Sequence, residues 1–208
     1  MKSAFFALCL SVLTLLPFGA SANGPTPDEL IGKLCDEVVD ILRTNKPARS
    51  GDTADTVRLV QEAVLPHFNF RRMTMLAVGR DWRTATPEQQ KRLTDAFYGM
   101  LTRTYSNALT QYRDQTVEVL PARMSPSDKI VRVQTEIHQP GGQPVSVDYV
   151  LEQRADGWKI FDIVVTGVSL VTNYRGTFSQ QIRSGGIDGL IRSLEAKGRE
   201  FTPRSGQS

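Results

Sequence analysis

The chain has 208 residues, of which 40% are hydrophobic and 23% charged, and its formal net charge is +3 at pH 7. This composition excludes a disordered chain, a collagen-like repeat and a small disulfide-stabilised scaffold. The weak positive charge, with no run of more than two basic residues, also argues against a nucleic-acid-binding protein.

The first 22 residues have the pattern of a secretory signal peptide. Lys2 is followed by the apolar run Ala4–Leu16, which is too short to anchor the chain in a bilayer, and then by the small residues Ala20–Ala22. We expect cleavage after Ala22, a single domain over residues 23–199 and a polar, frayed tail over residues 200–208. Cys35 is then the only cysteine of the exported protein, so we expect no internal disulfide and a buried thiol.

The first half of the exported chain predicts helices. Two segments, beginning at Thr26 and Thr86, place a capping threonine before a proline and a Glu or Gln three positions on. Apolar residues at steps of three and four follow each cap. The predicted helices begin and end close to residues 27–45, 52–65, 69–79 and 87–112.

After Arg113 the apolar period changes from 3.6 to 2, which predicts strands. Three segments alternate, whereas Trp158–Val165 is apolar on both faces and is expected to lie centrally in the sheet. Helical spacing returns from Leu170, with a break at Gly185-Gly186. The fold class is therefore α+β, with a four-stranded antiparallel sheet between N-terminal and C-terminal helices.

Motifs for chemistry are few. His67 and His138 fall on different predicted elements, and no metal-binding spacing surrounds them, so we expect no metal site. Gly167-Val168-Ser169 begins like a nucleophile elbow, but Val171 stands where a glycine belongs, and Ser169 is also well placed to cap a helix. We expect no catalytic residue, no cofactor and no enzyme, with a Ser169-dependent esterase as the alternative.

A surplus of apolar side chains remains on one face of the predicted sheet. It forms either a filled core or the wall of a ligand pocket, and periodicity alone does not separate these two interpretations. The residues of this row are Val117, Val119, Val131, Val133, Val147, Tyr149, Ile163 and Val165.

Six segments in the same order resemble the toluene-tolerance, MlaC-type family of periplasmic phospholipid-binding proteins. The resemblance extends from about Asp28 to Leu194 and covers nearly all of the exported chain. The segments are LPHFNF (65–70), GRDWR (79–83), ATPEQ (85–89), GWKIFD (157–162), GVSL (167–170) and GGIDGL (185–190).

The resemblance implies a twisted sheet clasped by helices, similar to the cone of nuclear transport factor 2, with a cavity that holds phospholipid acyl chains. It implies a periplasmic carrier that moves lipid between an outer-membrane lipoprotein–porin complex and an inner-membrane ABC transporter with a periplasmic lipid-binding subunit, and so maintains lipid asymmetry. The alternatives are the esterase and a non-enzymatic adaptor with a filled core.

We predict that apolar residues of the sheet and the helices line this cavity. Val168 is assigned from the resemblance, and the others from strand parity and helical phase. The headgroup is expected near Arg132 or Ser146, and Arg71, Arg72, Arg80 and Arg83 are a candidate docking face for partners. The predicted lipid-binding residues are Leu76, Leu101, Tyr105, Val147, Tyr149, Ile163, Val165, Val168 and Leu170.

Overall fold

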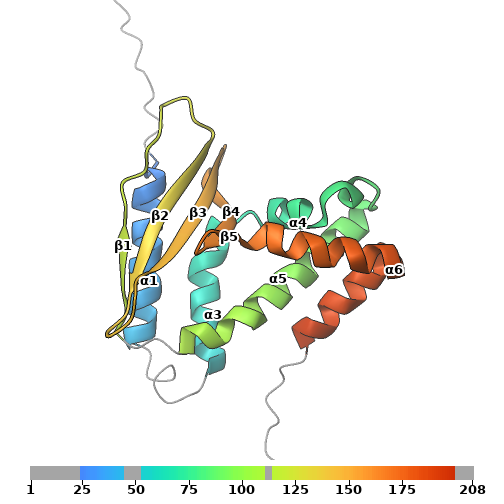
Figure 1. Ribbon diagram of the computed structural model, residues 1–208, viewed down its shortest axis with the longest axis horizontal. Coiled ribbons are helices and arrows are strands. Elements are labelled where there is room, and N and C mark those ends of the chain that lie inside the picture. The colour runs from blue at the N-terminus through green and yellow to red at the C-terminus, as the bar shows by residue number, and fades with distance from the viewer. Residues whose placement is uncertain (1–23, 45–52, 111–113, 200–208) are drawn as a thin grey trace, which may run out of the picture.

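A computed structural model of the chain describes residues 24–44, 53–110 and 114–199, so the predicted signal peptide and tail lie outside the described residues. The α+β class is confirmed, with a sheet and two helices at one end and a helical layer at the other (Figure 1). The helical elements are α1 (Pro27–Thr44), α3 (Thr53–Val64), η1 (Leu65–His67), α4 (Phe70–Val78), η2 (Gly79–Arg83), α5 (Pro87–Thr110) and α6 (Leu170–Arg199). The strands are β1 (Thr116–Val119), β2 (Ile130–His138), β3 (Val145–Arg154), β4 (Gly157–Val165) and β5 (Val168–Ser169).

Side-chain caps fix where three of these helices begin. The Thr26 backbone N–H donates to Glu29 Oε2 over 2.9 Å, and the Thr86 backbone N–H donates to Gln89 Oε1 over 3.0 Å. Asn69 Oδ1 accepts a hydrogen bond from the backbone N–H of Arg72 over 3.0 Å at the start of α4. The predicted helix starts are therefore confirmed, because capping depends only on residues adjacent in sequence.

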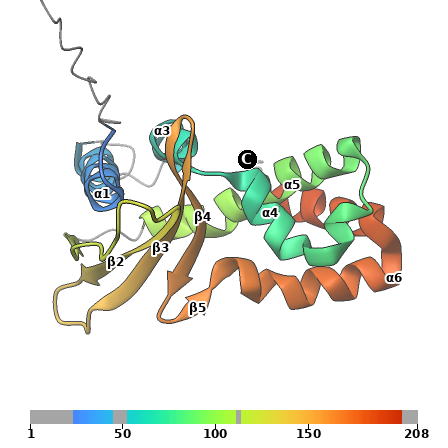
Figure 2. The same ribbon diagram turned by 90° about the horizontal axis from the view of Figure 1, so that it is seen from above.

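The strands form one antiparallel sheet in the order β1-β2-β3-β4-β5. The prediction of four strands missed β5, in which only two residues pair with the end of β4. So short a strand carries no alternating pattern that a sequence could reveal. Figure 2 shows α1 and α3 above the sheet, and α6 leading directly away from β5.

One extra residue interrupts the pairing of β3 with β4. Val150 pairs with Asp162 and Leu151 pairs with Ile160, which leaves Phe161 as the unpaired residue of a β-bulge. Ile160 therefore faces α1, whereas Phe161 packs among the helices on the other side. This confirms the prediction that β4 is covered on both faces. The prediction that β4 lies centrally in the sheet is wrong, because it is the fourth of five strands and pairs with β5 only at Val164 and Val165.

Two separate groups of buried side chains stabilise the fold. The sheet core lies between α1 and the sheet and consists of Leu30, Ile31, Leu34, Val131, Val133, Leu151 and Ile160. The helical core joins α4, η2, α5 and α6 and includes Met73, Trp82, Leu93, Phe97, Leu101, Phe161, Phe178, Leu190, Ile191 and Leu194.

The second half of α6 folds back over α5. Gly186 has a φ of 67° and a ψ of −177°, which is a conformation that glycine adopts without strain and that breaks the helix as predicted. Beyond it, Gly198 lies against α5, where an added Cβ would be in ordinary contact, 3.6 Å from the backbone of Gly99. The break at Gly186 thus brings the end of α6 against α5.

Candidate binding site

The apolar face of the sheet is dry at one end and open at the other. At one end, Leu151 pairs with Ile160, and both are fully buried beneath α1. At the other end, Val147 pairs with Val165, which is 40% exposed, and the neighbouring Val168 of β5 is 57% exposed. An aliphatic side chain gains free energy when it leaves water, so this open end is a candidate surface for an apolar ligand.

Tyr149 and Ile163 form a half-buried row between these two ends. The Tyr149 hydroxyl is buried beside Cys35 of α1 and shares a hydrogen bond with its thiol. Burial raises the pKa of Tyr149 well above its ordinary value, and burial also raises the pKa of the Cys35 thiol. Both groups therefore stay neutral at pH 7, which suits an apolar wall.

Tyr105 of α5 lies against the start of α6 and is 46% exposed. It is hydrogen-bonded to Tyr174, and burial followed by this contact raises the pKa of Tyr174 to about 12. Because Tyr174 follows Leu170 by one helical turn on the same face, Tyr105 lies where α6 leaves the sheet.

The structure separates the other eight predicted lipid-binding residues into two groups. Val147, Tyr149, Ile163, Val165 and Val168 share the apolar face, as strand parity predicts. Leu76, Leu101 and Leu170 instead belong to or pack against the helical core. Helical periodicity identified their buried face but not the element that covers it. A lipid contact remains a prediction for all nine.

The two residues expected at the headgroup do not reach the apolar face. Arg132 pairs across the sheet with Val150, and Ser146 pairs with Glu136, so both stand on the opposite face. There Arg132 Nη1 lies 3.3 Å from the buried carboxylate of Asp148, to which the Ser146 hydroxyl also donates over 3.1 Å. Arg132 thus offsets the charge of Asp148 and Ser146 hydrogen-bonds to it, and neither side chain lines the open end.

Ser169 caps α6. Its Oγ accepts a hydrogen bond from the backbone N–H of Thr172 over 3.0 Å and donates to Asp162 Oδ2 over 2.6 Å. The other oxygen of Asp162 accepts the backbone N–H of Val171 over 3.1 Å, so serine and aspartate together hold the helix start. Asp162, like Asp148 of the neighbouring strand, thus has structural partners.

The histidines lie far from Ser169. His67 belongs to η1, beside Lys159 at the start of β4, whereas Ser169 pairs near the end of that strand, about 17 Å away along it. Burial and then the charge of Lys159 lower the pKa of His67, so this imidazole is neutral. His138 belongs to β2, two strands away from β4. Neither imidazole is placed to activate the Ser169 hydroxyl.

His138 lies in a small polar cluster near the β1 edge. Its Nε2 lies 3.2 Å from Glu118 and 3.7 Å from Glu136, and the ligand atoms of all three residues fall within 4.8 Å of one another. These groups have the donor atoms of a metal site, but Glu118 is exposed, the other two are half-buried, and the three side chains already contact one another. They stand apart from the apolar face.

The basic residues predicted as a docking face do not form one set. Arg71 lies over Trp82 and donates to Gln90, and Arg72 pairs with Glu152 beside Phe161. Arg80 and Arg83 are exposed. Their proximity in sequence predicted a positively charged region, but it did not predict that Arg71 and Arg72 are already bound to neighbouring side chains.

Comparison with known proteins agrees with this geometry. The sequence model of the family described as "MlaC protein" matches residues 33–196, which is most of the chain. The chain belongs to the MlaC family. Among curated relatives of this family, the "Intermembrane phospholipid transport system binding protein MlaC" of Haemophilus influenzae is 22% identical over 199 residues, covering 92% of this chain and 91% of the relative.

A second relative matches more closely over a shorter stretch. The "Toluene tolerance protein ttg2D" of Pseudomonas putida is 31% identical over 106 residues, which is 51% of this chain and 49% of that protein. The chain thus aligns with about half the length of this relative.

A solved structure provides the geometric comparison. The phospholipid-binding protein from Ralstonia solanacearum, determined in complex with a phospholipid, is 34% identical to this chain. The two superpose with a TM-score of 0.75, and the match covers 81% of this chain and 94% of the Ralstonia chain. None of the helices described in the present structure has the length and apolarity needed to cross a membrane.

Proposed function

We propose that this protein is a periplasmic phospholipid carrier whose apolar sheet face holds acyl chains at its open end. The similarity to a Ralstonia structure with bound phospholipid is the observation that carries the proposal. The exposed side chains of Val165 and Val168 support it, because they continue a buried apolar face out to the surface. The nine predicted residues are its proposed contacts, and the sequence 1–22 is the proposed export signal.

The physical task of such a carrier is to keep acyl chains out of water. A two-chain phospholipid has roughly 30 methylenes, and at about 0.8 kcal/mol each their exposure costs roughly 24 kcal/mol. A protein surface that replaces bilayer hydrocarbon with valine, isoleucine and tyrosine side chains removes most of this cost. Loading and release are then nearly balanced, and no covalent chemistry is required.

Because loading and release are nearly balanced in free energy, the binding site itself does not set the direction of transport. Partner proteins must therefore set it. We propose that the partners are an outer-membrane lipoprotein–porin complex and an inner-membrane ABC transporter with its periplasmic lipid-binding subunit. Family membership and the transport-system name of the Haemophilus relative support this. The activity is then the maintenance of lipid asymmetry by a protein that is not an enzyme.

The test places one charge at the open end. Val168→Glu puts a carboxylate against the acyl chains, so we expect the purified variant to lose most of its bound phospholipid in native mass spectrometry. Ile130→Glu is the matched control, because Ile130 is also about half exposed but lies at the first position of β2, on the opposite face. It is expected to retain lipid. Both variants are expected to give the same far-UV circular dichroism spectrum as the parent protein, which shows that each is folded.

Extraction of the purified protein with organic solvent separates the alternatives. A carrier releases phospholipid, whereas an adaptor with a filled core releases none. An esterase loses hydrolysis of a phospholipid or acyl ester in Ser169→Ala, while the carrier keeps its lipid in that variant. Undiminished lipid in Val168→Glu would remove the proposed contact surface.

A further inference from the structure

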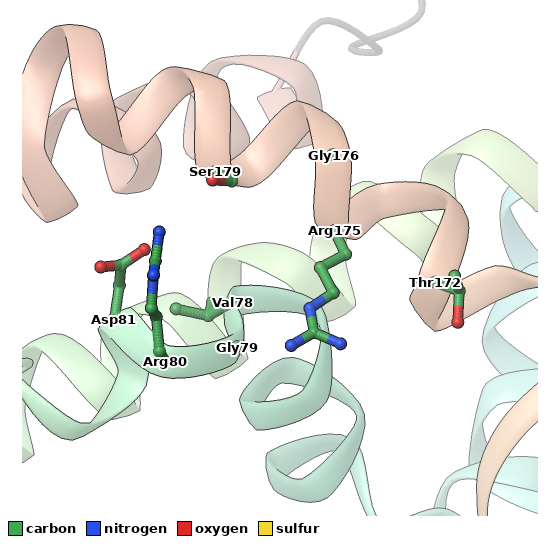
Figure 3. A pocket seen from close by; sticks show the side chains of 8 residues that line it. All are labelled: Val78, Gly79, Arg80, Asp81, Thr172, Arg175, Gly176 and Ser179. Atoms are coloured by element: carbon green, nitrogen blue, oxygen red, sulfur yellow. The ribbon is translucent and has the colours of Figure 1, made fainter.

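A pocket of about 470 Å³ lies between the end of α4 and the first half of α6 (Figure 3). One wall is the junction of α4 with η2, and the other is one face of α6. The residues that line it are Val78, Gly79, Arg80, Asp81, Thr172, Arg175, Gly176 and Ser179.

The local sequence keeps this pocket open. Thr172, Arg175 and Ser179 follow one another at helical spacing, so they share one face of α6, and Gly176 on that face has no side chain to fill the space. An added Cβ at Gly176 would meet no other atom within 4 Å. On the opposite wall, Gly79 ends α4 with a φ of +70°.

Two arginines enter the pocket from opposite walls. Figure 3 shows Arg80 extending from η2 toward α6, and Arg175 extending from α6 toward the end of α4. The guanidinium of Arg175 packs over Gly79, with its Nε 3.2 Å from the position that a Cβ would take. Arg175 thus lies at the carbonyl end of a helix, where a positive charge is favoured.

Neither arginine has a hydrogen bond or ion pair with another residue in the described ranges 24–44, 53–110 and 114–199. Arg71 and Arg72, by contrast, are both engaged by neighbours. A third guanidinium, that of Arg183, donates to the Ser179 hydroxyl at the pocket edge over 2.7 Å. Asp81 is the one acidic residue in the lining, so the pocket has a net positive charge.

We propose that this pocket docks an acidic segment of a partner protein, whose Asp or Glu carboxylates are held between Arg80 and Arg175. Guanidinium groups bind carboxylates through two parallel hydrogen bonds, and the hydroxyls of Thr172 and Ser179 add polar partners. Both arginines are exposed to solvent and stand on the two walls of the pocket, so side chains of one short peptide can reach both of them. The inference rests on the proposed function in one respect: a carrier must be held by the proteins that load and unload it.

The experiment uses a capped hexaglutamate peptide as the probe and the ¹⁵N-labelled full-length exported protein. We expect peptide addition to shift the amide signals of Gly79 and Gly176, which line the pocket, and to leave that of Gly141 unchanged in the distant β2–β3 turn. Arg80→Glu and Arg175→Gln are each expected to lower the affinity for the peptide at least about tenfold, equivalent to about 1.4 kcal/mol. Gly176→Phe fills the pocket without changing its charge and is expected to weaken binding similarly.

Arg123→Glu is the matched control, because Arg123 is an exposed arginine in the loop before β2. It is expected to change peptide affinity by less than about twofold. Unchanged affinity in all three pocket variants, or amide shifts that spare Gly79 and Gly176, overturns the proposal. It is also overturned if the protein does not bind the peptide but binds vesicles of equal parts phosphatidylcholine and phosphatidylglycerol, and if that vesicle binding depends on Arg80 and Arg175.

Measuring bound phospholipid in the same samples separates this proposal from the carrier function. Lipid present without peptide binding removes only the docking pocket. Peptide binding that depends on Arg80 and Arg175 in a protein without lipid removes only the carrier function.

Discussion

The helical core and the sheet core differ in how completely they are closed. Phe97, Phe178, Leu190 and Ile191 of the helical core are almost entirely inaccessible to water. The sheet core is equally dry beneath α1 but continues into side chains that become more exposed toward β5. The closed core buries all of its apolar surface when the protein folds, whereas the open end of the sheet leaves part of its apolar surface exposed to a ligand. Stability and the proposed binding function therefore belong to different parts of one small protein.

The most disruptive test of this difference removes a large side chain from each region. Phe178 is 2% exposed and packs edge-on against Phe97, with the ring centroids 5.1 Å apart. We expect Phe178→Ala to lower the free energy of unfolding by about 3–5 kcal/mol, because it leaves a cavity. Val168→Ala is expected to change it by less than about 0.5 kcal/mol, since its side chain is already hydrated. Urea titration measures both, and similar losses would contradict the division.

The second test breaks a polar link between the two regions. Glu152 of β3 is buried, accepts a hydrogen bond from Asn69 Nδ2 over 2.6 Å and pairs with Arg72 of α4. Replacing it by Gln leaves the Arg72 charge partly buried without a counter-ion. We expect Glu152→Gln to lower the free energy of unfolding by about 2–3 kcal/mol.

A control for this change is available on the neighbouring strand. Glu136→Gln alters a glutamate of β2 whose side chain is 43% exposed, so we expect a loss below about 0.5 kcal/mol in the same urea titration. If the two variants unfold alike, Glu152 does not connect the sheet to α4.

A smaller effect is expected at the join of β5 with α6. Ser169→Ala removes the side-chain oxygen that accepts the backbone N–H of Thr172, and we expect a loss of about 1 kcal/mol. Ser169→Thr keeps a hydroxyl at the cap and is expected to restore most of it. Thermal unfolding of both variants measures the effect. A stable Ser169→Ala protein would show that Asp162 holds the helix start without help.

The smallest effect appears at alkaline pH. The folded protein raises the pKa of Tyr149 above the ordinary value of 10.0, so the neutral hydroxyl contributes fully to the free energy of unfolding below pH 10. Above pH 10 this contribution is lost, because Tyr149 ionises in the unfolded chain before it ionises in the folded protein. We expect Tyr149→Phe to reduce this loss by less than about 1 kcal/mol at about pH 10.5, measured by urea titration. Identical pH profiles for parent and variant would mean that the Tyr149 hydroxyl is reached by water in the folded protein.

Local sequence signals predicted most of the elements of this fold. Thr26, Asn69 and Thr86 cap their helices because capping needs only neighbours a few positions away. The bulge at Phe161 and the pairing of β5 depend on strands that meet only after folding. No pattern within one segment could have revealed them.

The candidate site was predictable to a similar extent. Strand parity brought Val147 and Val165 to one face, because alternation fixes the direction of each side chain. The pocket that contains Arg80 and Arg175 was missed, since these residues are almost a hundred positions apart in sequence and share no motif. The signal that could have suggested it is the polar row Thr172, Arg175 and Ser179, which runs along the same helix as the buried Val171 and Phe178.

The fold-back of α6 at Gly186 has a consequence for how the protein is made. The arm after Gly186 supplies Leu190, Ile191 and Leu194 to the side of α5, and Arg92 of α5 joins Glu195 of that arm over 2.8 Å. These contacts span about a hundred residues, so a ribosome must complete almost the whole polypeptide before α5 gains its cover. Until then α5 lacks this cover, which suits the passage through a translocation channel that the proposed export requires.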